Sequence, residues 1–158
     1  MDPILKAYLK KHNIQYQSYE HPEVFTVEEA KATKEQIPAQ HAKCLFLKSN
    51  TGAFYLVGMK ADKRLDINTL QKTLQVKKLR FASAEELLQK LKLTPGSVSI
   101  FGLIHSEKVI FLLDEEVWRS DSVGFHPNIN TATLVLDHDN LEKYYDSLLN
   151  EKRIVELL

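Results

Sequence analysis

Three short stretches of the chain hold the residues best suited to chemistry: Lys43 before the apolar run CLFL, Gly96 in PGSVS, and His126 in FHPNIN. A lysine at the mouth of a strand either lies at a solvated edge or donates to a carbonyl, carboxylate or phosphate. Consecutive backbone N–H groups on a bend can hold a ribose, a phosphate or an oxyanion, although Pro95-Gly96 also fits a type II turn. Together these types suit a polar ligand that carries a carbonyl or a phosphate.

His126 lies in an unusual setting, because Pro127 restrains the backbone next to it. Asn128 and Asn130 follow, and an asparagine side chain offers both a donor and an acceptor. That combination suits ribose hydroxyls or a substrate carbonyl. A polar turn that leads into a strand explains the same residues equally well.

Several other chemistries have no support in the sequence. None of the six histidines forms an HxxxH or HExxH pair, and Cys44 has no CxxC partner, so we expect no metal. No GxSxG, GxGxxG or P-loop pattern occurs, so neither a serine nucleophile nor a bound cofactor is expected. A hydrolase with this sequence would position water rather than form an acyl-enzyme.

The composition indicates one ordinary globular domain over residues 1–158. The formal net charge is zero and hydrophobic residues make up 44% of the chain, so an RNA partner would need a local basic cluster. No apolar run is long enough to span a membrane, and the N-terminus has no apolar signal core, so we expect a cytoplasmic protein. The candidate RNA-contacting cluster consists of Lys48, Lys77, Lys78 and Arg80.

Helices and strands are interspersed, with hairpins and short strands in the middle. The patterns predict helices that begin at Asp2, Thr26, Asp66 and Ser83, and a last helix over 137–149 in which Leu141, Tyr145 and Leu148 face inward. Strands are predicted in 14–21, 43–49, 53–60, 77–82 and 108–116, and the last one follows His126. This order favours an α/β fold of the α+β type, with a mixed, largely antiparallel sheet flanked by helices.

Four segments in series, HAKCLFLKS, LRFASAEEL, TPGSVSIFGLI and FHPNINTATL, resemble the YbaK/ProX family of aminoacyl-tRNA editing domains. The resemblance covers nearly the whole chain and is greatest to the free-standing ProX-type branch, which deacylates alanyl-tRNA(Pro). It implies trans-editing, which is hydrolysis of the aminoacyl ester at the acceptor end of mischarged tRNA(Pro). It also implies tRNA and prolyl-tRNA synthetase as partners.

The resemblance implies a role for each matching residue. Lys43 matches the functional lysine of K-x-L-F-L-K, and Gly96 matches the loop whose backbone holds the terminal adenosine. His126 and Asn130 match H-P-x-x-N, where His126 places the adenosine or the water. The expected contacts with the aminoacyl group come from the segment YEHPEVFTVEEA and from GLIHS, through Val24, Phe25, Thr26, Gly102 and His105.

The chain departs from the family pattern at Cys44, where an asparagine is usual, at Ile100, where a proline is usual, and at His105-Ser106. These departures leave two alternatives open. The first is a cysteinyl-tRNA(Pro) deacylase, and the second is a module of the same fold that binds tRNA or a synthetase without catalysis.

Overall fold

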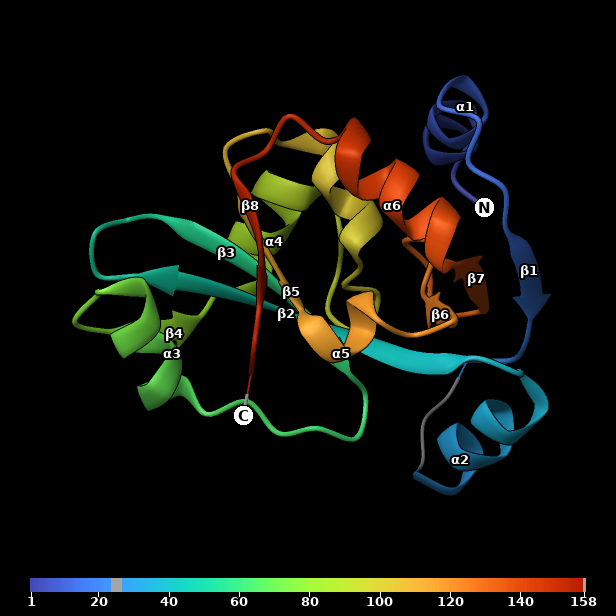
Figure 1. Ribbon diagram of the computed structural model, residues 1–158, viewed down its shortest axis with the longest axis horizontal. Helices are drawn as coiled ribbons and strands as arrows, with labels where there is room; N and C mark the ends of the chain where they lie inside the picture. The colour runs from blue at the N-terminus through green and yellow to red at the C-terminus, as the bar shows by residue number, and fades with distance from the viewer. Residues whose placement is uncertain (24–26, 158) are drawn as a thin grey trace.

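The computed structural model describes residues 1–23 and 27–157 (Figure 1). Its helices are α1 (Pro3–Lys11), α2 (Val27–Gln36), α3 (Ile67–Leu74), α4 (Ala84–Leu91), the 3₁₀ helix η1 (Ile100–His105), α5 (Glu115–Trp118) and α6 (His138–Ser147). Its strands are β1 (Gln17–Glu20), β2 (Gln40–Ser49), β3 (Phe54–Lys60), β4 (Leu79–Phe81), β5 (Ile110–Asp114), β6 (Ser122–Phe125), β7 (Ala132–Asp137) and β8 (Lys152–Val155).

The described strands form one eight-stranded sheet in the order β1-β7-β6-β2-β3-β5-β8, with β4 paired to β2. The pairs β1–β7, β6–β7, β2–β3 and β2–β4 are antiparallel, whereas β2–β6, β3–β5 and β5–β8 are parallel. This arrangement confirms the predicted mixed, largely antiparallel sheet. The predicted hairpin is confirmed as well, with Gly52 at φ 91° in the turn between β2 and β3.

The long strand β2 joins the two halves of the sheet. Its first residues pair in parallel with β6, at Gln40↔Val123 and His41↔Gly124. From Ala42 onward its other edge pairs with β3, and its end pairs with β4. Successive side chains of a strand point to opposite faces, so Cys44 and Phe46 fill one apolar core while Leu47 fills the second.

Helix ends follow the capping signals in the sequence. Ser83 accepts from the N–H of Glu86, whose carboxylate accepts from the N–H of Ser83, which completes the predicted capping box of α4. The side chains of Asp2 and Asp66 cap α1 and α3 by accepting from the N–H groups of Ile4 and Thr69. The helix predicted after the first strand is present as α2, but its predicted cap, Thr26, lies outside the described residues.

The sequence reading was wrong about the C-terminal part of the sheet in two respects. The last strand is β8, not the strand that follows His126, and the short elements β6 and α5 were not predicted. In α6 the fully buried tyrosine is Tyr144, whose hydroxyl donates to the carbonyl of Ile100 at 2.6 Å, whereas Tyr145 is only partly buried. Strands of four residues such as β6 and β8 are too short to show a period.

Asp114, at the end of β5, ties three parts of the chain together. Its side chain is 1% exposed and accepts from the Lys63 ammonium at 2.9 Å, and from the N–H of Leu157 at 3.2 Å. Lys63 also contacts Glu116 at 2.7 Å. The contact with Lys63 therefore fixes the loop that follows β3, which borders the site described below.

We expect Asp114→Ala to lower the free energy of unfolding by about 2–4 kcal/mol, because it leaves a buried N–H without an acceptor and Lys63 without its buried partner. Asp114→Asn should cost less, since its carbonyl can still accept from Leu157. Urea unfolding measures both values. Glu107→Ala, at an exposed position, is the control and should stay within about 0.5 kcal/mol of the parent protein. Equal stability of Asp114→Ala and the control would contradict this account.

Candidate functional site

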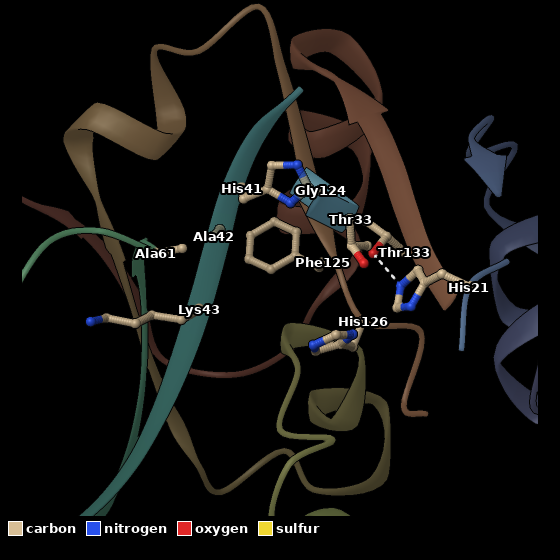
Figure 2. Close-up of a pocket in the computed structure, with 10 residues that line it drawn as sticks. All are labelled: His21, Thr33, His41, Ala42, Lys43, Ala61, Gly124, Phe125, His126 and Thr133. Carbon is tan, nitrogen blue, oxygen red and sulfur yellow. Dashed lines mark hydrogen bonds between the residues drawn. The ribbon is translucent and has the colours of Figure 1, made fainter. Parts of the chain in front are cut away.

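A cavity of about 210 Å³ opens where β2 and β6 part (Figure 2). The two strands pair only as far as His41 and Gly124, so the residues that follow them diverge and leave space between them. The lining is largely small or aromatic and comes from six parts of the chain: His21, Thr33, His41, Ala42, Lys43, Ala61, Gly124, Phe125, His126 and Thr133. Phe125 is 2% exposed and belongs to the main core, so the floor of the cavity is rigid.

His126 enters the cavity directly after the end of β6. Its Nδ1 lies 3.1 Å from the carbonyl oxygen of Ala132, so Nδ1 carries the proton and Nε2 keeps its lone pair. Burial lowers the pKa of His126 below its ordinary value of 6.5, and nearby His21 lowers it further, although the bond to Ala132 acts in the opposite direction. The imidazole is therefore neutral at pH 7, and Nε2 can accept a hydrogen bond from water or a ribose hydroxyl.

Lys43 lines the same cavity from β2. Among the described residues no carboxylate lies within ion-pair distance of its ammonium group. Figure 2 shows that the side chain extends away from His126, so the ammonium group reaches a ligand in the cavity only after a change of rotamer. The structure thus places Lys43 and His126, which are far apart in the chain, at one cavity.

Three other predicted residues lie elsewhere. Gly96 occupies a type II turn at φ 90°, closed by the bond from the N–H of Ser97 to the carbonyl of Thr94, and the space above it is open. Gly102 is buried in η1, where an added Cβ would lie 2.6 Å from the side chain of Leu93. His105 lies beside the start of α1, with its Nε2 4.0 Å from the carboxylate of Asp2. None of the three lines the cavity.

Asn130, another predicted substrate contact, does not line the cavity either. Asn130 donates to the carboxylate of Glu23 at 2.6 Å, at an exposed position. Val24, Phe25 and Thr26 lie outside the described residues.

The predicted basic cluster lies at the far end of β2. Lys48 is five residues beyond Lys43, which corresponds to roughly 17 Å along an extended strand. Lys48 and Arg80 are register partners and share the carboxylate of Glu86, at 3.1 and 2.9 Å. Lys77 and Lys78 are exposed. In Figure 1, α2 and β4 lie at opposite ends of β2. Helix α2 contributes Thr33 to the cavity, whereas β4 carries Arg80.

Comparison with known proteins gives a consistent result. The profile of the aminoacyl-tRNA editing domain matches residues 21–144. The chain is 36% identical to "Prolyl-tRNA editing protein ProX" of Acetoanaerobium sticklandii over 96% of this chain and 94% of that protein. It is 37% identical to "Prolyl-tRNA synthetase associated domain-containing protein 1" of Xenopus laevis, over 82% and 81%. The chain belongs to the aminoacyl-tRNA editing domain family.

Solved structures agree on the fold of this editing domain. A structure described as a candidate trans-editing enzyme for prolyl tRNA synthetase superposes with a TM-score of 0.77, at 20% identity, over 99% of this chain and 98% of that chain. Among the described residues no helix is long and apolar enough to cross a membrane. Within the same residues, no three metal-binding side chains are grouped as a metal ion would need.

The structure explains one departure from the family pattern. Cys44 points to the opposite face of β2 from Lys43, into the main core, and burial raises the pKa of its thiol to about 12. A thiol that stays protonated is no nucleophile, so the departure changes core packing rather than cavity chemistry.

The sequence reading missed most of the cavity wall. Five residues that line the space were assigned no role: His21, His41, Ala61, Gly124 and Thr133. Three of them, His21, His41 and Thr133, lie inside segments that carried the family resemblance. One signal was available for Gly124, since a glycine inside a strand often marks a close approach of another group. A Cβ at this position would lie 2.9 Å from Cγ2 of Thr133.

We expect Gly124→Ala to destabilise the protein by about 1–3 kcal/mol, because the added methyl group overpacks against Thr133. Thr133→Ser removes Cγ2 and keeps the hydroxyl group, so the double variant should recover part of the loss. Urea unfolding of the parent, the two single variants and the double variant gives the coupling energy. Additive losses would show that this contact is not the cause.

The lowered pKa of His126 predicts a pH dependence of stability. The unfolded chain binds a proton at His126 more readily than the folded protein does. Folding with a neutral His126 therefore contributes stability that is fully present above pH 6.5. This contribution is lost as the pH falls through the lower pKa that His126 has in the folded state. Below pH 6.5, the stability of the parent should therefore fall more steeply than that of His126→Asn. Urea unfolding between pH 5 and 8 measures the difference, and parallel profiles would contradict a lowered pKa.

Proposed function

We propose that this chain hydrolyses the aminoacyl ester of tRNA(Pro) mischarged by prolyl-tRNA synthetase, with alanyl-tRNA(Pro) as the preferred substrate. The proposal rests on similarity to a prolyl-tRNA editing protein over almost the entire chain. The observation that carries it is that Lys43 and His126, from two separate motifs, line one small cavity with a largely apolar lining.

In the proposed reaction, water attacks the ester carbonyl, and the bond to the ribose oxygen of the terminal adenosine breaks. The products are the free amino acid and deacylated tRNA. His126 accepts a hydrogen bond through Nε2 and orients the water or the ribose hydroxyl. Lys43 swings toward the cavity and offsets the charge that develops on the carbonyl oxygen.

Contacts outside the cavity would hold the rest of the acceptor end. The open space above Gly96 lets a ligand approach the backbone of its turn, which supports the proposed contact with the terminal adenosine. Lys77 and Lys78 are exposed and suit phosphate contacts. Lys48 and Arg80 already share Glu86, so we assign them a smaller part of the binding.

The decisive experiment compares deacylation of alanyl-, cysteinyl- and prolyl-tRNA(Pro) by the purified protein. Fastest hydrolysis of the alanyl ester, with little of the prolyl ester, supports the proposal. Preference for the cysteinyl ester would make the chain a cysteinyl-tRNA(Pro) deacylase. Binding of tRNA without hydrolysis of any of the three would make it a non-catalytic module.

We expect Lys43→Ala to lower the single-turnover rate by about 10²-fold or more, because a positive charge near the carbonyl oxygen is lost. Folding should be little affected, since Lys43 has no ion-pair partner among the described residues. Urea unfolding provides that check, and Lys108→Ala, at an exposed position, is the matched control. A normal rate in folded Lys43→Ala would remove this residue from the reaction.

A further inference from the structure

The segment Asn130–Thr133, which we call the NTAT segment, contacts residues 21–23 at three points. The N–H of His21 donates to the carbonyl of Thr131 at 2.9 Å, which continues the ladder between β1 and β7. The imidazole of His21 meets the hydroxyl of Thr133 at 3.0 Å (Figure 2). Asn130 donates to the carboxylate of Glu23 at 2.6 Å.

Two contacts engage both nitrogens of the His21 imidazole. The Nδ1 atom of His21 lies 3.0 Å from the carbonyl oxygen of Pro22, so Nδ1 carries the proton. In the neutral ring Nε2 is then an acceptor, and the hydroxyl of Thr133 donates to it. Both nitrogens are thus occupied, so His21 is held as a wall and is not available for proton transfer.

This contact lies at the cavity itself. His21 and Thr133 both line the cavity, and Thr133 is 5% exposed. Gly124 adds a second constraint, since the absence of its side chain lets the methyl group of Thr133 pack against the backbone of β6. Thr133 is therefore held by its methyl group on one side and holds His21 by its hydroxyl group on the other.

We propose, on the basis of the proposed function, that the NTAT segment is a clamp that fixes His21 as a wall of the aminoacyl cavity. Thr133 and Asn130 are its positioning residues, and the clamp sets the selectivity for the amino acid. Asn130 then contributes through Glu23 rather than by touching the substrate. A wall with both ring nitrogens bonded does not move aside for a larger acyl group, so the cavity rejects that group by shape.

The experiment combines a kinetic and a spectroscopic measurement. Thr133→Val keeps the shape of the side chain but removes the hydroxyl group, whereas Thr133→Ser keeps the hydroxyl group. Asn130→Asp places a carboxylate against Glu23, and Asn130→Asp/Glu23→Lys restores an attractive pair. Thr73→Val, on the exposed surface of α3, is the control for loss of a threonine hydroxyl group.

The kinetic measurement is the ratio of kcat/KM for alanyl-tRNA(Pro) to that for prolyl-tRNA(Pro). We expect Thr133→Val to lower this ratio about 5- to 10-fold, mainly through better use of the prolyl ester. Asn130→Asp should lower it about 2- to 3-fold, because its contact with Glu23 is exposed. The double variant should restore the ratio, and Thr73→Val should leave it unchanged.

The spectroscopic measurement follows His21 directly. The ¹⁵N signals of its imidazole and the exchange rate of its amide proton should change in Thr133→Val and should stay close to those of the parent in Thr133→Ser. Asn130→Asp should speed exchange of the same amide. If Thr133→Val does not fold, the pair of Asn130 variants on the surface carries the test.

Three results would overturn the clamp as the basis of selectivity. An unchanged ratio in Thr133→Val and Asn130→Asp is one, even if the signals of His21 move, because the contact is then only structural. A changed ratio with unmoved His21 signals is another, because Thr133 then acts by touching the substrate. If the parent hydrolyses no aminoacyl-tRNA, the proposed function fails and the selectivity role fails with it, while the His21 signals alone decide whether the clamp exists.

Discussion

The hydrogen bonding of β2 on both edges at His41 is the constraint on which the rest of the site depends. One edge pairs with β6 at Gly124, and the carbonyl of His41 also accepts from the N–H of Ala61 just beyond β3. Strand β6 ends at Phe125, whereas β2 continues along β3. The two strands therefore separate, and the cavity is the space that this separation leaves. Lys43 and His126 both line it because each lies within two residues of the last paired position, His41 or Gly124.

The chemistry available in the cavity follows from the same geometry. His126 leaves β6 at its end and turns its Nδ1 to the carbonyl of Ala132 on β7, so the sheet itself selects the tautomer. Burial then keeps the ring neutral. His21 is also held by backbone and hydroxyl groups, through both of its ring nitrogens. The two imidazoles, with ring centroids 6.5 Å apart, thus differ in role: His126 keeps an acceptor for a ligand, and His21 does not.

The sequence predicted the elements that have strong local signals and missed those whose structure depends on distant partners. Ser83 and Glu86, or Asp66 before its apolar stripe, specify a helix start within one turn, and both predictions are confirmed. Motif resemblance predicted Lys43 and His126 as site residues, and both line the cavity. Thr133 and Gly124 could not be found in this way, because their importance lies in a contact between β6 and β7 that no local pattern shows. For the same reason, motif resemblance placed Gly102 near the ligand, although it is packed against Leu93.

The H-P-x-x-N stretch has two faces, and they explain why its residues cannot share one role. His126 and Asn130 are four residues apart around a turn in which Asn128 adopts φ 64°. That left-handed residue reverses the chain, so that Thr133 returns along β7 beside Gly124 and closes the cavity wall. Asn130 is carried to the outer side, where it meets Glu23. A motif that looks like a single ligand site in sequence therefore becomes, in three dimensions, one residue at the cavity and another that secures the segment next to it.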